Sequence, residues 1–233
     1  MNSWPRSGSL DLPAIHLPLG RLDYSTADRL QKRLHGLRCQ GSIPDTIITV
    51  EHNAVFTIGR SGSKANLIAS PYLMQKEGIG VYSVDRGGDI TYHGPGQLVM
   101  YPIVDLRRHG SDLHAYVNRL EQGTIDYLAE EGVTARRRPG YPGVWVNSRK
   151  IASLGVYVKR WVTRHGLALN IKTNKKHFSM IRPCGMDIET VCLDELIDHT
   201  PSLSVAAEGL VDQMKRLFGW QIEKADPESF LKE

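Results

Sequence analysis

Three β-type runs follow one another closely between residues 143 and 171 of this 233-residue chain. Their sequences, GVWVN, KIASLGVYV and GLALNI, are rich in apolar and β-branched residues and are joined by short polar turns. This pattern is typical of consecutive strands. A doubly wound sheet, in which a helix follows every strand, does not fit such a series.

Long helices separate and follow two groups of such strands. Hydrophobic periodicity predicts helices over about 24–38 (capped by Ser25), 111–131 (capped by Ser111) and 205–218. A brief helix is expected over about 70–78, and earlier strands are expected at 46–50, 55–58, 79–84 and 97–104. We therefore expect an α+β fold with mixed sheets flanked by helices.

The chain reads as one domain. Its length, with 41% hydrophobic and 23% charged residues, suits a globular protein with a real core. No proline- or serine-rich linker divides it. We expect residues 1–12 to form a disordered lead-in and residues 13–233 to form a single domain.

The composition also predicts a location. The longest apolar run, Leu98 to Val104, is far shorter than the ~18 residues of a membrane-spanning helix. The N-terminal residues resemble no targeting signal. Three cysteines are too few for a disulfide framework and indicate a reducing compartment. We expect a cytoplasmic protein that does not bind membranes.

The net charge of +4 is distributed very unevenly. Residues 132–186 contain twelve Lys or Arg and no Asp or Glu, so this basic stretch carries +12. The rest of the chain holds 17 basic and 25 acidic residues, or −8. Such a run is most often a solvated face, and it can also attract an acidic partner.

The segment RGGDITYHGPGQLVMY, from Arg86 to Tyr101, combines four glycines with several polar side chains. Glycines let a backbone approach a ligand closely or adopt positive φ. A tight hairpin with incidental polar residues is an equally weighted alternative. Neither the phosphate-loop spacing nor G-x-G-x-x-G occurs in the chain, so no motif supports nucleotide binding.

Cys184 is the strongest candidate for a reactive residue. It lies in IRPCGM, where a proline and a glycine place the thiol on a short turn at the end of the basic stretch. Lowering a thiol pKa from about 8.5 to ~7 takes about 2 kcal/mol, which a nearby cation could supply. Cys39 and Cys192 fit better as small apolar residues.

Metal binding and serine hydrolysis have little support. Of the nine histidines, only His93 lies among residues that suggest a site, and His109 and His114 have no cysteine or second pair with which to form a zinc cluster. No G-x-S-x-G sequence is present. We expect neither a metal nor another cofactor.

Four blocks of the sequence resemble the lipoyl(octanoyl) transferases, from about Leu19 to Leu217. The first is the glycine-rich segment with Arg86-Gly87-Gly88, Thr91-Tyr92-His93, Gly96-Gln97 and Tyr101. The others are KIASLG from Lys150, HGLALN from His165 and Pro183-Cys184-Gly185. The resemblance implies the fold of biotin and lipoate protein ligases, with one catalytic domain.

The resemblance also implies an activity and its residues. Such enzymes move an octanoyl or lipoyl group from acyl carrier protein to a lysine of lipoyl domains, the first step of endogenous protein lipoylation. Cys184 would carry the acyl thioester, and Lys150 would lower the pKa of its thiol. From the chemistry of the second step we add the hypothesis that Lys150 then accepts a proton from the incoming amine. The implied substrate-binding residues are Arg86, Gly87, Gly88, Asp89, Ile90, Thr91, Tyr92, His93, Ser153, Leu154, Gly155, Gly166, Leu167 and Ala168.

The implied partners are octanoyl-acyl carrier protein as donor and, as acceptors, the lipoyl domains of 2-oxoacid dehydrogenase E2 subunits and the glycine cleavage H protein. One alternative is an ATP-dependent lipoate or biotin protein ligase of the same fold, which would need no nucleophilic cysteine. Another is a nucleic-acid-binding module that uses the basic stretch and its aromatic residues. We expect no nucleic-acid partner, because those aromatics fall at strand positions that should be buried.

Overall fold

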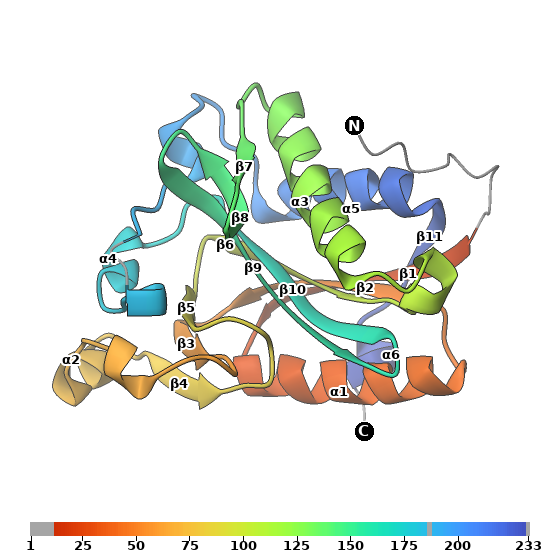
Figure 1. Ribbon diagram of the computed structural model, residues 1–233, viewed down its shortest axis with the longest axis horizontal. Helices are drawn as coiled ribbons and strands as arrows, with labels where there is room; N and C mark the ends of the chain where they lie inside the picture. Colours follow the sequence, from red (N-terminus) through yellow and green to blue (C-terminus); the bar gives the residue numbers. More distant parts are fainter. Residues whose placement is uncertain (1–11, 186–187, 232–233) are drawn as a thin grey trace.

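The computed structural model describes residues 12–185 and 188–231 of the chain. Most strands form one large mixed sheet that runs through the middle of the molecule (Figure 1). Its eight strands lie in the order β11 (Trp220–Lys224), β1 (Leu12–Leu22), β2 (Asp45–His52), β6 (Gln97–Ile103), β10 (Val162–Asn170), β9 (Arg149–Lys159), β8 (Tyr141–Val146) and β7 (Arg136–Arg138). Residues 1–11 of the expected lead-in lie outside the described residues, and Leu12 already belongs to β1.

A smaller sheet contains three strands, β4 (Gly80–Ser83), β3 (Val55–Ile58) and β5 (Ile90–His93), in that order. Strands β5 and β6 follow each other in sequence but belong to different sheets, so the hairpin alternative for the glycine-rich segment is wrong. The chain crosses between the sheets at Gly94-Pro95-Gly96. Gly96 has a φ of 80°, and a Cβ there would lie 2.0 Å from the Lys172 carbonyl oxygen, so this crossing requires glycine.

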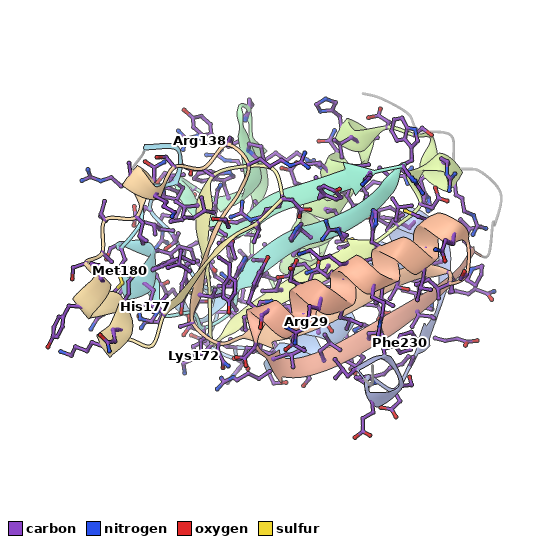
Figure 2. The ribbon with its side chains drawn as sticks, turned by 90° about the horizontal axis from the view of Figure 1, so that it is seen from below. Arg29, Arg138, Lys172, His177, Met180 and Phe230 are labelled. Atoms are coloured by element: carbon purple, nitrogen blue, oxygen red, sulfur yellow. The ribbon has the colours of Figure 1, made fainter. Side chains whose placement is uncertain are left out.

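Three long helices cover the large sheet. Helix α1 (Tyr24–Gln40) packs on one face through residues such as Leu34, and Figure 2 shows it lying over the sheet. Helices α3 (Leu113–Glu130) and α5 (Leu203–Phe218) pack on the opposite face. The shorter helices are α2 (Pro71–Lys76), α4 (Lys175–Phe178) and α6 (Glu228–Leu231). No helix in the described ranges is long and apolar enough to cross a membrane.

The predicted helices are confirmed, but two of their caps are wrong. Asp23, and not Ser25, is the N-cap of α1. Asp112 replaces Ser111 as the N-cap of α3, where its carboxylate accepts a hydrogen bond from the Ala115 backbone at 3.0 Å. Both misplacements are small, since serine and aspartate are alternative cap residues and in each helix an aspartate within two residues of the expected serine holds the N-cap position.

The three strands expected between 143 and 171 are confirmed as β8, β9 and β10. Strand β1 was not predicted, because Pro13 and Pro18 look like strand breakers in the sequence. It nevertheless lies inside the sheet, parallel to both neighbours, with a register irregularity between Pro18 and Arg21. Pro18 lies at this irregularity, and Pro13 precedes the pairing with β2, which begins at Ala14.

Candidate active site

A cavity of about 330 Å³ lies between the large sheet and the small sheet. This volume is at the lower end of the range of small-molecule sites, about 300–1,000 Å³. Residues far apart in sequence line it, namely Tyr24, Arg86, Gly88 to Thr91, His93, Tyr101, Gly140 to Pro142, Lys150, Ser153 to Gly155, His165 to Ala168, Phe178, Pro183, Ile188 and Thr190.

The middle strands of the large sheet supply one wall. In the antiparallel pair of β9 and β10, Ser153 lies opposite Ala168 and Gly155 lies opposite Gly166. Small side chains at these four positions leave room above the strands. The KIASLG and HGLALN blocks therefore meet in register on one surface.

The segment 86–88 crosses this surface. The Gly87 backbone N–H donates to the Val156 carbonyl oxygen at 2.8 Å. A Cβ at Gly155 would lie 3.0 Å from both Arg86 Cδ and the Gly87 carbonyl oxygen. Glycine at position 155 therefore allows the Arg86 segment to rest directly on β9.

His93 and His52 are buried beside the cavity as neutral imidazoles. Burial lowers the pKa of His93 to about 3, and its Nδ1 lies 2.7 Å from the Gln97 side-chain oxygen. Burial also lowers the pKa of His52 to about 4, and its Nε2 hydrogen-bonds the Tyr101 hydroxyl at 2.8 Å. These side chains therefore bring hydrogen-bonding groups to the site without adding charge near neutral pH.

Lys150 lies near the start of β9, and residues of strand β8 hold its side chain in place. Its Nζ donates to the Pro142 carbonyl oxygen at 3.0 Å and lies 4.9 Å from the centre of the Trp145 ring. Gly143 makes room for it, because a Cβ there would lie 3.1 Å from Lys150 Cε and 2.6 Å from the Ala152 carbonyl oxygen. The ammonium group is thus held at the cavity wall.

The backbone of Lys150 is tied to the segment that follows Cys184. The Lys150 N–H donates to the Glu189 carbonyl oxygen at 2.9 Å, and the Val191 N–H donates to the Lys150 carbonyl oxygen at 3.0 Å. These two bonds form a parallel bridge between Lys150 and Thr190. Strand β9 and the chain after Cys184 therefore run side by side at the cavity.

Cys184 is the middle residue of a short 3-10 turn, Pro183–Gly185. The chain entering this turn is anchored by the Arg182 N–H, which donates to the Asn66 carbonyl oxygen at 2.8 Å. Gly185 adopts a φ of 69°, as a tight turn permits for glycine. The side chain of Cys184 lies outside what the structure describes, whereas Pro183 lines the same cavity as Lys150.

The cavity brings together Lys150 and all the expected substrate-binding residues except Gly87 and Tyr92. The Tyr92 ring packs in the core of the small sheet, and its hydroxyl lies 2.8 Å from His177 Nδ1. Sequence reasoning missed Tyr24, Tyr141, His165 and Phe178 as lining residues. Three of these lie outside the quoted blocks, and His165 carried no local sign of a role.

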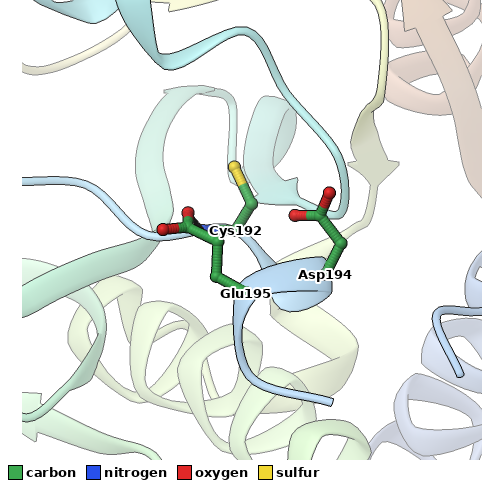
Figure 3. Close-up of side chains that lie close together, drawn as sticks. All are labelled: Cys192, Asp194 and Glu195. Atoms are coloured by element: carbon green, nitrogen blue, oxygen red, sulfur yellow. Dashed lines mark hydrogen bonds between the residues drawn. The ribbon is translucent and has the colours of Figure 1, made fainter. Parts of the chain in front are cut away.

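The other two cysteines do not line the cavity, and Cys192 is buried in the core. Burial raises the pKa of the Cys192 thiol to about 11, and its Sγ lies 3.4 Å from the Thr173 carbonyl oxygen. Cys192 lies close to Asp194 and Glu195 (Figure 3). Glu195 is already engaged there, since it accepts hydrogen bonds from Lys175 Nζ at 2.5 Å and from the Cys192 backbone at 2.8 Å. The group formed by Cys192, Asp194 and Glu195 is therefore explained by the capping of the short helix that follows Cys192, and its thiol is protonated near neutral pH.

Part of the basic stretch forms an exposed edge beside the cavity. Strand β7, at the edge of the large sheet, consists of Arg136, Arg137 and Arg138. Arg137 is paired with Glu121 of α3 at 3.0 Å. Arg138 stacks on the ring of Tyr141, a cavity residue, at 4.4 Å from the ring centre.

Comparison with known proteins identifies the family. Residues 23–215 match the family described as "Lipoyl protein ligase A/B catalytic domain". An octanoyltransferase of Solibacter usitatus is 43% identical over 204 residues, which cover 88% of this chain and 92% of the relative. An octanoyltransferase of Syntrophobacter fumaroxidans is 44% identical over 218 residues, which cover 92% of this chain and 95% of the relative.

Solved structures confirm the fold. A lipoate-protein ligase A bound with ATP superposes with a TM-score of 0.75 at 15% identity and covers 94% of this chain and 93% of that one. A bi-partite lipoate protein ligase from Thermoplasma acidophilum gives a TM-score of 0.73 at 13% identity, and the superposition covers 94% of this chain and 91% of that one. The predicted α+β fold and the family resemblance are both confirmed. The chain belongs to the lipoyl protein ligase A/B catalytic family and, within it, to the octanoyltransferases.

Proposed function

We propose that this octanoyltransferase passes the octanoyl group from acyl carrier protein to a lipoyl-domain lysine through a thioester on Cys184. One observation carries the proposal: two backbone hydrogen bonds tie Lys150 to the segment that follows Cys184, at a cavity to which Pro183 also contributes. These contacts support a position of the Lys150 ammonium near the turn that bears the thiol. That pairing favours the thiolate, which is the reactive form of cysteine.

In the first step the Cys184 thiolate attacks the acyl carbonyl carbon of the donor. A bond forms between that carbon and Sγ, and the bond to the phosphopantetheine sulfur breaks. The leaving thiolate then takes up a proton. Because one thioester replaces another, the step needs little driving force but does need an activated nucleophile. No separate activating cofactor is required.

In the second step a lysine of the acceptor attacks the thioester as a free amine. An amide bond forms, and Cys184 leaves as a thiolate. With a pKa of ~10.4, fewer than one in a thousand such lysines is deprotonated at pH 7, so a base is needed. Lys150, no longer stabilised by a thiolate once Cys184 is acylated, can give up its own proton and accept that of the amine.

The cavity suits the alkyl chain of the substrate. Tyr24, Tyr101, Ala168 and Phe178 contribute apolar surface, while Gly155 and Gly166 leave space. Burial of methylenes is favourable by ~0.8 kcal/mol each, so an eight-carbon chain binds well in such a site. We assign this cavity to the octanoyl group.

The proposal extends to partners and location. The donor is octanoyl-acyl carrier protein, and the acceptors are lipoyl domains of 2-oxoacid dehydrogenase E2 subunits and the glycine cleavage H protein. These partners imply a cytoplasmic enzyme. A basic surface beside the cavity mouth, including Arg136 and Arg138, would favour acidic partners.

Intact-mass spectrometry after incubation with octanoyl-acyl carrier protein tests this route. We expect a hydroxylamine-labile octanoyl adduct on the wild-type chain without ATP. It should be lost in Cys184→Ser and retained in the matched controls Cys39→Ser and Cys192→Ser. An adduct that survives in Cys184→Ser would overturn the assignment, and acyl transfer only in the presence of ATP would favour a ligase instead.

A further inference from the structure

The two ends of the cavity differ in exposure. Gly140 and Pro142, near Lys150, are exposed and form its mouth. At the other end Tyr24, Arg86 and His165 are all buried. Gly155 is five residues from Lys150 along β9, so at strand geometry their Cα atoms lie about 16–17 Å apart. A chain attached near Lys150 therefore points along β9 toward Arg86.

The sheet surface beyond Gly155 is already filled. The next pair with the same orientation is Tyr157 and Arg164, which lie opposite each other on β9 and β10. The Tyr157 ring packs against His35 of α1, with ring centres 5.9 Å apart. Arg164 is buried and paired with Asp85. Arg86 is thus the side chain that lies between the open part of the cavity and this packed region.

Arg86 is held as a rigid group. The residue is only 7% exposed, and its Nη2 donates to the carbonyl oxygen of Thr57 at 2.6 Å and to the Thr57 hydroxyl at 2.9 Å. Nη1 donates to the Gly87 carbonyl oxygen at 3.0 Å. Displacing the guanidinium would leave these buried oxygens without donors, which is costly. A longer ligand therefore cannot easily push it aside.

We infer that Arg86 is the end stop that sets the length of the acyl chain this enzyme accepts. The inference rests on the proposed assignment of the cavity to the acyl group. Each additional buried methylene would by itself favour binding about fourfold, so an open-ended pocket would prefer longer chains. A fixed polar group at the closed end reverses that preference beyond one length.

Arg86→Met tests the stop, because methionine is apolar and ends about two atoms short of the guanidinium tip. The variant is offered an equimolar mixture of hexanoyl, octanoyl, decanoyl and dodecanoyl thioesters of pantetheine with a lipoyl domain. The acyl amides formed on the acceptor are then quantified by mass. We expect the decanoyl-to-octanoyl ratio to rise about fifteenfold, the gain for two methylenes. Arg164→Met, a buried arginine on β10 outside the cavity, is the matched control and should leave the ratio unchanged.

Arg86→Lys covers the case in which Arg86→Met does not fold. Lysine keeps a donor for Thr57 but lacks the guanidinium fork, and we expect about a fourfold rise in the same ratio. An unchanged ratio in a folded Arg86 variant, or an equal loss for every chain length, would overturn the inference. Because the readout is the amide product, it reports chain length even if no adduct forms on Cys184, so the two proposals fail separately.

Discussion

Lys150 shows how one side chain acquires a role from its surroundings. In the sequence it is one of twelve basic residues in a stretch without acids. In the structure its ammonium lies under the Pro142 carbonyl and over the Trp145 ring, at the cavity wall. Its backbone is bonded to the segment after Cys184. The family motif identified this lysine, whereas the contacts that fix it come from β8 and residues 189–191 and could not be predicted locally.

Replacement of Lys150 by methionine should slow both chemical steps. We expect single-turnover formation of the acyl-enzyme, and its transfer to a lipoyl domain, each to fall by about 10²-fold or more, because proton transfer by a positioned group contributes about 10²–10⁴-fold. Lys159→Met, an exposed lysine on the same strand, is the control and should behave as wild type. If Lys150→Met transferred a preformed octanoyl group at the normal rate, Lys150 could not be the base of the second step.

The way the strands pair explains why some of them, but not others, could be predicted from the sequence. Strands β8, β9 and β10 are joined by short turns and pair with their sequence neighbours, so local alternation reveals them. Strand β11 is short and pairs only with β1, over 200 residues away in sequence. Likewise, nothing local shows that β5 joins the small sheet and β6 the large one. The cavity lies between the two sheets. The motifs therefore identified many of its lining residues, but the sequence could not show that these residues come together in space.

Gly143, at the start of the β8–β9 pair, supports the position of Lys150. Its φ is 131°, and an added Cβ would meet Lys150 Cε at 3.1 Å and the Ala152 carbonyl oxygen at 2.6 Å. We expect Gly143→Ala to lower the rate of acyl-enzyme formation at least tenfold while the far-ultraviolet circular dichroism stays native. Gly132→Ala is the control, since that glycine also has positive φ, nothing lies within 4 Å of its added Cβ, and it does not line the cavity. Equal rates in the two variants would contradict the role of Gly143.

The whole molecule is more polarised than its net charge suggests. Some of the twelve basic residues in the acid-free stretch are paired with acidic residues of the chain, as with the buried Arg164 beside Asp85 and the exposed Arg137 beside Glu121. Arg136 and Arg138 are exposed on the edge strand β7, and Arg138 contacts Tyr141 at the cavity. The folded structure therefore separates structural arginines from those available to a partner, which composition could not do.

Charge reversal at β7 should affect the carrier protein and spare small substrates. We expect Arg136→Glu with Arg138→Glu to slow acylation by octanoyl-acyl carrier protein about tenfold or more at low salt, and less at high salt, because electrostatic steering is screened. Acylation by octanoyl-pantetheine should change by less than twofold. Equal slowing with both donors would show that the edge only supports the fold.

The central claim is that the octanoyl group travels through Cys184, and a chase of the isolated intermediate tests it most directly. Octanoyl-enzyme is freed of donor and mixed with a lipoyl domain in a rapid-quench experiment without ATP. The account predicts that octanoyl-lysine appears on the acceptor as fast as, or faster than, steady-state turnover, while the adduct on Cys184 disappears in equal amount. An adduct that persists, or that transfers far more slowly than turnover, would contradict the covalent route.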